Sequence, residues 1–496
     1  MKTIGLYFDF PFSTTITREG LGRVAGYMLK TAAEGVPNVK FVIACPRGMQ
    51  KNIPLLEKEF NFDSKKLDIL TSKKIFILEY VLSCIFMMFS VFLMISIAFL
   101  KVLKRIFHIY KKYRNNFDCK NVSESQKRRV VDPYWLYVIK RLSCMSINDV
   151  HSKIIGTFIQ KKEKIYLINI INLRQDIDFW FSPCVFWKEF TLINKIKICC
   201  VPDIFPYLLP IPFSIEKAAL WGERVARDVI KKCDYFITYS NFVKYYALVE
   251  GFSIDPHKIF PVPLAAFCGA SGFSPQKEKR ENIRKYICSI IKNKARFPNN
   301  LNLIDLDRPY IFYATQIRPN KNIFQLIKAF AYLVHENKTV CNLILTASYF
   351  DSVKRIIYEN NIEDRIIIAP NLSSYELDAF YFCAEIAIAP TLTEGGAFPA
   401  KLPEALAMET PAIISRIPIV TDALTFPEKY NYMLFDPYDW EDIAEKIQWG
   451  VQNREKLLNV QRPLFREIMV RSWKDVINDY IDVFNYIYKI KNMEQL

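Results

Sequence analysis

The segment 385–414 constrains the fold more than any other part of the chain. An apolar run at 385–390 ends in a loop that holds an acidic residue beside two glycines at 394–396. Glu404 then opens an Ala/Leu-rich stretch, which stops before the next apolar run at 412–414. This order of strand, Gly-rich turn, helix and strand predicts a parallel βαβ unit. Its loop, helix N-terminus and two glutamates would share the crevice at the carboxyl ends of the strands, where open α/β sheets bind ligands.

The two glutamates suit the two ends of a nucleotide-sugar. A carboxylate only accepts hydrogen bonds, so it holds a pair of hydroxyl groups well, and both ribose and hexose present such pairs. Gly395 and Gly396 would let the backbone approach the sugar closely. Taken alone, Glu404 is better explained as a charge that favours the helix dipole. The glycines, Pro403 before the helix and Pro411 after it together favour a ligand site.

This stretch resembles the donor motif of retaining glycosyltransferases of the GT-B fold, glycosyltransferase family 4. The family motif reads Glu, seven residues, Glu, followed by Ala-x-Ala-x-Gly-x-Pro; residues 404–411 fit it, with Glu409 where glycine is usual. Nine residues separate Glu394 from Glu404, so this loop is two residues longer than in the family. The resemblance implies that Glu404 binds the ribose and that Glu394 orients or supports the sugar. It implies further donor contacts at Gly395, Gly396, Ala397 and Phe398.

A basic turn upstream of this motif suits a diphosphate. Residues 310–314 read as a strand, and Arg318 and Lys321 follow before an amphipathic helix near 324–333. Arginine binds phosphate as a fork and lysine as a point charge, although a solvated basic turn is the alternative interpretation. The family also carries an arginine and a lysine in this loop. Lys321 aligns directly, whereas Arg318 is shifted from the usual position, which lies nearer Gln316.

The resemblance also implies a reaction. Glycosyl transfer with retention of configuration and front-face attack would let the departing phosphate help to deprotonate the acceptor. Lys321 and Arg318, together with helix N-termini, would stabilise the leaving diphosphate. Glu394, Lys321 and Arg318 are therefore the expected catalytic residues. We expect neither a metal nor another cofactor, because Lys321 and Arg318 can supply the positive charge and the four histidines lie far apart in the sequence.

The first half of the chain carries a second βαβ pattern. Residues 3–10 read as a strand, a glycine-containing loop leads into a helix over 21–34, and 39–45 reads as the next strand. The N-terminus of that helix could face a phosphate or the acceptor. The family has a glycine-rich loop in the same place. On it fall the donor-side candidates Gly20 and Gly22 and the acceptor-side candidate Arg23.

Further strands are predicted along the first half. They are expected at 164–171, 178–181, 195–201, 235–238 and 258–263. The loop after the third of them reads Val201-Pro202-Asp203, where the family usually has His-Asp. Asp203 is therefore an acceptor-side candidate, and an Asx-turn is an equally good explanation of it.

An apolar segment interrupts this pattern. Residues 80–100 contain no charged side chain, which is long enough to span a bilayer, and basic residues flank the segment within 73–114. A single span would separate the first two strands from the rest of their sheet. We therefore expect a re-entrant or in-plane contact with an anionic membrane through residues 73–114. A buried helical insertion and a true span are the alternatives.

Composition limits the class of partner. The net charge of +16 favours anionic partners, and without an RNP or zinc-finger motif nucleic acid is the weaker choice among them. The 51% of hydrophobic residues excludes a mainly disordered chain. The chain begins with a predicted strand rather than a signal peptide, so we expect a cytoplasmic protein at the inner face of the membrane.

Together these features predict an α/β protein with two doubly wound Rossmann-like domains that face each other across a cleft. We expect an acceptor-side domain at 1–268 with a helical insertion at about 51–150, a linker at 269–308, a nucleotide-sugar-binding domain at 309–472, and a helix at 473–496 that crosses back to the first domain. The predicted function is transfer of a sugar from a nucleoside-diphosphate sugar to a glycan or lipid-linked acceptor at the membrane surface, as in polysaccharide biosynthesis. The alternatives are a non-catalytic membrane-surface scaffold with a decayed donor site and a nucleotide-sugar epimerase.

Overall fold

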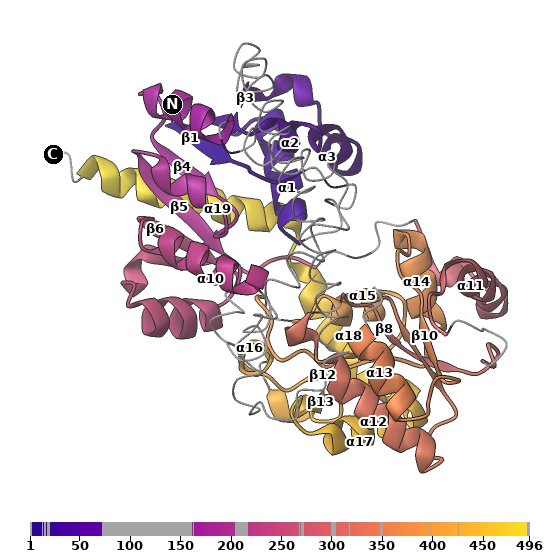
Figure 1. The fold of residues 1–496 in the computed structure, drawn as a ribbon. Helices are drawn as coiled ribbons and strands as arrows, with labels where there is room; N and C mark the ends of the chain where they lie inside the picture. The colour runs from indigo at the N-terminus through magenta and orange to yellow at the C-terminus, as the bar shows by residue number, and fades with distance from the viewer. Residues whose placement is uncertain are drawn as a thin grey trace, which may run out of the picture.

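The computed structural model describes two α/β domains (Figure 1). It describes residues 2–11, 13, 16, 20–71, 161, 163–203, 217–266, 268, 272–298, 304–316, 318–347, 351–396, 398–424 and 426–493. The apolar segment 80–100 and its basic flanks at 73–114 lie outside these ranges, so their expected membrane contact stays a prediction. Within the described ranges, no helix combines the length and the apolar character needed to cross a bilayer.

The first domain is built on a seven-stranded parallel sheet of order β3-β2-β1-β4-β5-β6-β7. Chain connections reverse direction between β1 and β4, which makes the gap between these strands the topological switch point. Residues of β1 and β4 are almost entirely buried, as expected for parallel strands covered by helices on both faces. The strands are β1 (Lys2–Tyr7), β2 (Val39–Ala44), β3 (Asp68–Leu70), β4 (Phe179–Ser182), β5 (Ile196–Val201), β6 (Tyr235–Thr238) and β7 (Ile259–Pro261).

Helices cover this sheet between its strands. They are α1 (Gly20–Glu34), α2 (Arg47–Gln50), α3 (Ile53–Phe60), a helix at 163–173, α10 (Lys217–Ile230) and the π-helix η4 (Val243–Glu250), with short 3-10 turns η2 (Ser64–Lys66), η3 (Lys188–Leu192) and η5 (Pro256–Lys258). α1 lies so close to the loop after β1 that a Cβ atom on Gly22 would be only 1.9 Å from the carbonyl oxygen of Ile16. Only glycine fits at that position.

Two expectations for the first domain are wrong. Residues 164–171 are helical, not a strand, because Leu167, Ile168 and Ile171 form one buried stripe at helical spacing. The insertion does not begin at residue 51. Instead, α3 packs beside α1, and β3 extends the sheet by pairing in parallel with β2.

The second domain is built on a six-stranded parallel sheet of order β10-β9-β8-β11-β12-β13. Its switch point lies between β8 and β11, so the topology repeats that of the first domain. The strands are β8 (Tyr310–Tyr313), β9 (Asn342–Leu345), β10 (Ile366–Ile368), β11 (Ile386–Ala389), β12 (Ala412–Ser415) and β13 (Leu434–Phe435). The helices are α11 (Arg280–Lys294), α12 (Ile323–His335), α13 (Asp351–Glu359), α14 (Ser374–Cys383), α15 (Lys401–Ala407), α16 (Pro418–Ala423), α17 (Trp440–Gln452) and α18 (Arg454–Val470), with the 3-10 turns η6 (Pro275–Lys277), η8 (Pro319–Lys321) and η9 (Pro427–Tyr430).

The stretch expected as a linker, 269–308, belongs largely to this domain. Phe273, Ile283 and Phe297 are buried in the same hydrophobic core as β8 and β11. Phe297 also forms an antiparallel bridge with Ile368 of β10. The basic residues of α11 lie on its exposed face, whereas apolar residues on the other face pack into the core. This is why a stretch that reads as a linker belongs to the domain.

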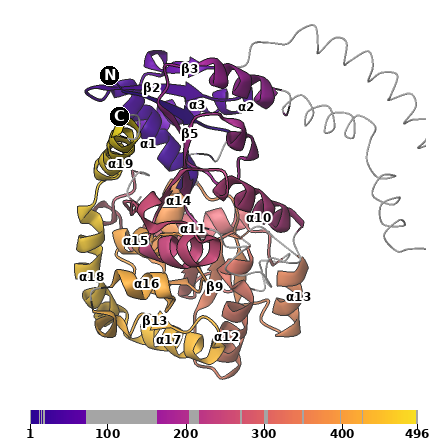
Figure 2. The ribbon, with the colours of Figure 1, turned by 90° about the vertical axis from the view of Figure 1, so that its left-hand side faces the viewer.

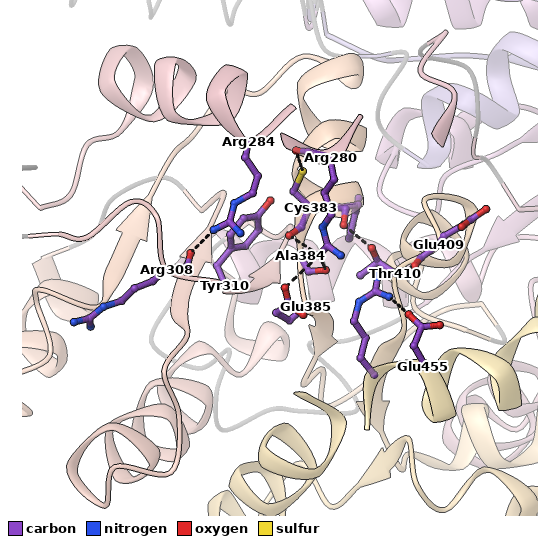
Figure 3. A network of polar contacts seen from close by, with 12 residues as sticks. Arg280, Arg284, Arg308, Tyr310, Cys383, Ala384, Glu385, Glu409, Thr410 and Glu455 are labelled. Atoms are coloured by element: carbon purple, nitrogen blue, oxygen red, sulfur yellow. Dashed lines mark hydrogen bonds and ion pairs between the residues drawn. The ribbon is translucent and has the colours of Figure 1, made fainter. Parts of the chain in front are cut away.

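Arginines of α11 fasten it at the amino ends of the strands, away from the switch-point crevice (Figure 3). Arg280 donates to the carbonyl oxygens of Cys383 and Ala384, both at 3.0 Å, at the end of α14. Arg284 donates to the carbonyl oxygens of Asp307, at 2.6 Å, and of Arg308. Carbonyl groups at a helix end lack partners within the helix, so the Arg280 contacts satisfy them and have a structural role.

The last helix returns to the first domain. α18 lies along the second domain, and α19 (Trp473–Met493) crosses to the sheet of the first (Figure 2). Val476, Tyr480 and Phe484 of α19 are buried in the first core. Trp473 stacks on Tyr27 of α1 at a ring distance of 4.6 Å, and its indole donates to the carbonyl oxygen of Ala266. The chain therefore crosses between the domains twice, near 266 and near 472.

Candidate functional site

Two loops meet at the switch point of the second sheet. The loop after β8 carries Lys321, and the loop after β11 carries Glu394; Lys321 Nζ lies 2.7 Å from Glu394 Oε1. Asn320 joins the two loops, because its carbonyl oxygen accepts from the backbone N–H of Leu392 at 2.8 Å and its side-chain amide donates to the carbonyl oxygen of Thr393. The pair predicted from separate motifs thus lies in one crevice.

The ion pair between Lys321 and Glu394 is only partly covered. The side chains are 23% and 16% exposed. The fully buried Tyr313 donates to the carbonyl oxygen of Lys321 at 3.0 Å and fixes the turn from below. The ammonium group is therefore held in place by its backbone while solvent, or a ligand, can reach it.

Glu404 lies in the first turn of α15 with two donors on one oxygen. Lys401 Nζ lies 2.8 Å from Oε2, and the hydroxyl of Tyr381 donates to the same atom at 3.2 Å. Burial raises the pKa of Tyr381 well above its ordinary value, and the charge of Glu404 raises it further, so the hydroxyl keeps its proton. The carboxylate is thus held by a permanent neutral donor from α14 and a cation from its own helix.

The helix does not open at Glu404, as the sequence suggested, but at Lys401. The loop between the two glutamates is two residues longer than the family motif, and its last three residues lie in the first turn of α15. Lys401 and Glu404 are then three residues apart on one helix, where side chains are neighbours. This spacing is what brings them into contact.

The two glycines beside Glu394 differ in their surroundings. A Cβ atom on Gly395 would lie 2.3 Å from the carbonyl oxygen of Pro202 and 3.3 Å from Cβ of Asp203, in the first domain. Nothing lies within 4 Å of the corresponding position on Gly396. Gly395 is therefore required by a close approach of the two domains, while Gly396 faces open space.

The first domain supplies Asp203 and Arg23 to the same cleft. Asp203 lies against Gly395, beside the loop that carries Glu394. Burial lowers the pKa of Arg23 below its ordinary value, and the negative charges of Glu404 and then Glu59 act in the opposite direction. Arg23 therefore lies near enough to Glu404 for the two charges to interact across the cleft.

The remaining predicted site residues are less closely connected. Arg318 is exposed before η8, and its guanidinium contacts neither Glu394 nor Glu404. Phe398 packs against the second core, which gives it a structural role. Gly20 begins α1, and Gly22 packs against Ile16. Ala397 lies outside the described residues.

Sequence reasoning missed three polar groups around the site. Tyr381 lies in an apolar helix, and nothing in its local pattern signals a contact with α15. Lys401 stands three residues before Glu404, a spacing that would have indicated the pair if the helix start had been placed correctly. Asp9 follows β1 and forms an ion pair with Lys164 at 2.7 Å at the switch point of the first sheet.

Two buried oxygen atoms near the crevice form no hydrogen bond with any residue that the structure describes. They are Oδ1 of Asn320 and Oγ1 of Thr391, on the loops after β8 and β11. Buried polar atoms are nearly always satisfied by protein, solvent or ligand. Among the described residues no group of three or more His, Cys, Asp or Glu side chains could hold a metal ion, and the expectation that no metal is needed stays a prediction.

Two facing domains with repeated Rossmann topology and a charged crevice at the switch point define the GT-B class of fold. Solved structures support this assignment across almost the whole chain. A glycosyltransferase from Rickettsia africae covers 98% of this chain and 99% of its own, with a TM-score of 0.51 and 14% identity. HepE of Anabaena, solved with UDP-glucose, covers 99% and 100%, with a TM-score of 0.56 and 10% identity.

Residues 296–462 match the model of the family "Glycosyl transferases group 1". The O-antigen chain mannosyltransferase RfbU of Salmonella typhimurium is 24% identical over 260 residues, which are 50% of this chain and 60% of that protein. The MMP alpha-(1->4)-mannosyltransferase of Mycolicibacterium hassiacum is 26% identical over 167 residues, or 34% and 40%. The chain thus spans 60% or less of the curated relatives it matches.

Proposed function

We propose that this protein transfers a glycosyl group from a nucleoside-diphosphate sugar to a glycan or lipid-linked acceptor. The observation that carries the proposal is the contact between Lys321 and Glu394, 2.7 Å apart at the switch point of the second sheet. This sheet lies within the residues that match the glycosyl transferases group 1 model. A cation and a carboxylate side by side match a donor that joins a diphosphate to a sugar. Glu404, on the next helix, supplies a second carboxylate for hydroxyl groups.

The residues have distinct tasks in this proposal. Lys321 offsets the charge that develops on the leaving diphosphate, since a fixed ammonium in a partly covered crevice stabilises such charge better than bulk water. Glu394 shares that ammonium and orients the sugar through its hydroxyl groups. Glu404 accepts hydrogen bonds from the ribose. Arg318, exposed at the mouth of the loop, adds positive charge without a fixed contact.

The finer features of the proposal rest on resemblance and on charge. Retention of configuration is what the family motif implies. A mannosyl or other hexosyl donor agrees with the two mannosyltransferase relatives. A lipid-linked acceptor at the cytoplasmic face of an anionic membrane agrees with the net charge of +16 and with the O-antigen chain function of one relative.

The proposal is tested by donor-dependent release of nucleoside diphosphate. Purified protein is incubated with UDP-glucose, GDP-mannose and ADP-glucose, with detergent-dispersed polyprenyl-linked saccharides as acceptors. For the productive donor, we expect Lys321→Ala to lower kcat/KM by about 100-fold or more, the usual effect of removing one electrostatic stabiliser. Glu404→Gln should mainly raise the donor KM.

Thermal unfolding of each variant shows whether it still folds, so that lost activity is assigned to the site. Full activity in both folded variants would refute the site assignment. Binding of a nucleotide-sugar with no turnover on any acceptor would favour a non-catalytic scaffold. Conversion of the donor to its epimer, without release of nucleoside diphosphate, would favour an epimerase.

A further inference from the structure

Lys401 is a cation that the donor motif does not explain. It lies within the loop that is two residues longer than the family motif, at the first residue of α15. Its ammonium contacts Glu404 at 2.8 Å, and the two side chains are 29% and 9% exposed. The pair is therefore well covered, unlike a typical solvated pair on a helix surface.

Helix stability does not account for this pair. A cation in the first turn of a helix opposes the macrodipole, which favours anions at the N-terminus. The order with lysine before glutamate is also the less favourable one for such a pair on a helix. The helix dipole and the order of the pair therefore do not explain Lys401, and its contact with Glu404 is the remaining explanation.

Lys401 and Tyr381 both act on the same oxygen of Glu404. A carboxylate oxygen has two lone-pair positions, and these two donors use both positions of Oε2. Oε1 accepts no hydrogen bond from any residue that the structure describes. The carboxylate is thus fixed with one oxygen occupied by protein and the other oxygen available.

We propose that Lys401 is a positioning residue for donor recognition: by holding Oε2 of Glu404, it directs Oε1 toward a ribose hydroxyl of the nucleoside diphosphate. This inference rests on the proposed function. Lys401 acts through Glu404 and does not contact the phosphates. It follows that Lys401 matters only while Glu404 can accept hydrogen bonds on both oxygens, and only for a nucleotide that carries the recognised hydroxyl.

A double-mutant cycle tests this dependence. Binding of UDP, GDP and ADP to the full chain is measured by calorimetry for the parent, Lys401→Met, Glu404→Gln and the double variant. For the nucleotide that binds, we expect Lys401→Met to raise Kd by about tenfold, as for a lost hydrogen bond to a charged group. In the Glu404→Gln background the same change should have no further effect.

Three further measurements separate positioning from a merely structural role. The 2′-deoxy and 3′-deoxy forms of the nucleotide should each be compared with the parent form; Lys401→Met should reduce the penalty for losing the recognised hydroxyl. Lys401→Arg should restore most of the affinity, because arginine can also donate to Oε2. Lys285→Met, which removes a lysine from an exposed pair with Glu281 in α11, is the matched control and should leave Kd unchanged.

The outcomes are distinct. An equal loss from Lys401→Met with and without Glu404→Gln would overturn the inference, since Lys401 would then act directly on the phosphates. Unchanged Kd in Lys401→Met would overturn it as well. If the parent binds none of the three nucleotides, the proposed function fails and the inference fails with it.

Discussion

The two domains place a lysine–carboxylate pair at the same point of the same topology, yet the pairs differ in depth. Lys164–Asp9 at the end of β1 and Lys321–Glu394 between β8 and β11 are both 2.7 Å apart. Their lysines are similarly exposed, at 26% and 23%, whereas the carboxylates are 4% and 16% exposed. The distance between partners is the same, so burial is what distinguishes the two sites.

Depth changes what each pair can do. Burial raises the pKa of Asp9 to about 6, even though Lys164 lowers it; Glu189 adds a small increase, and a hydrogen bond with Tyr7 a small decrease. A charge buried this way costs free energy that its partner only partly offsets. The carboxylate of the Lys321–Glu394 pair is more exposed, which suits the role in ligand binding that we propose for this pair. Ion pairs of equal length therefore need not be equally suited to binding.

The largest expected effect is on the pH dependence of the free energy of unfolding, and it tests the buried pair Lys164–Asp9. Because the folded-state pKa of Asp9 is raised, the folded protein keeps a proton that the unfolded chain has already lost between about pH 4 and 6. The contribution of Asp9 to stability therefore falls as pH rises through that window. In Asp9→Asn this fall is absent, so the stability of the variant relative to the parent should rise by up to about 3 kcal/mol between pH 4 and 7.

Urea unfolding of the first domain at several pH values measures this difference. The attraction between Lys164 and Asp9 appears only as Asp9 ionises, and it is already included in the pKa of about 6, so it adds no separate slope. Asp176→Asn is the matched control, since Arg174 lowers the pKa of Asp176 to about 2 and no proton exchange is expected in the same window. Parallel pH curves for the parent and Asp9→Asn would contradict the burial argument.

An effect of intermediate size tests whether the reaction requires the close approach of the two domains at Gly395. In Gly395→Ala the new methyl group would lie 2.3 Å from the carbonyl oxygen of Pro202 and push the domains apart. We expect kcat/KM to fall by about tenfold, the scale of a modest steric overlap, with little change in Tm because each domain keeps its core. Gly396→Ala, in open space, should stay near the parent. Equal activity of the two variants would show that this approach is not needed for the reaction.

The smallest effect comes from a lysine–carboxylate pair outside both crevices. Lys285 and Glu281 on α11 lie 3.2 Å apart but are 74% and 82% exposed. Lys285→Met should change the free energy of unfolding by less than about 0.5 kcal/mol, because water and salt screen such a pair. A change comparable to that from Asp9 would mean that depth is not the property that separates these pairs.

The sequence predicted the sheets well because buried parallel strands read as continuous apolar runs. β6 was placed at 235–238, as observed, and β8 at 310–314, where it spans 310–313. The error at 164–171 has the same origin, since a short apolar run fits a strand or a buried helix equally well until its spacing is examined. α11 was misplaced as a linker for the opposite reason, because its exposed charges outweighed its narrow apolar face.

The residues of the candidate site could be predicted where the signal lies in a short stretch of sequence. Lys321, Glu394 and Glu404 follow strands at recognisable spacings, and the structure brings the first two into contact. Tyr381 and the contact of Gly395 with Pro202 depend on elements that meet only in three dimensions. Asp9 was missed because a single carboxylate after a strand has no local signal, and its pairing with Lys164 depends on a helix that was taken for a strand.

The return of α19 to the first domain has a consequence for synthesis of the protein. The sheet of the first domain is complete in sequence at β7, but its core also contains Val476, Tyr480 and Phe484. Until α19 has left the ribosome, this core exposes the apolar surface that α19 covers, while most of the second domain has already emerged. Domains generally fold as units in the order of their synthesis. In this chain the domain that is made first is the one that can be completed only last.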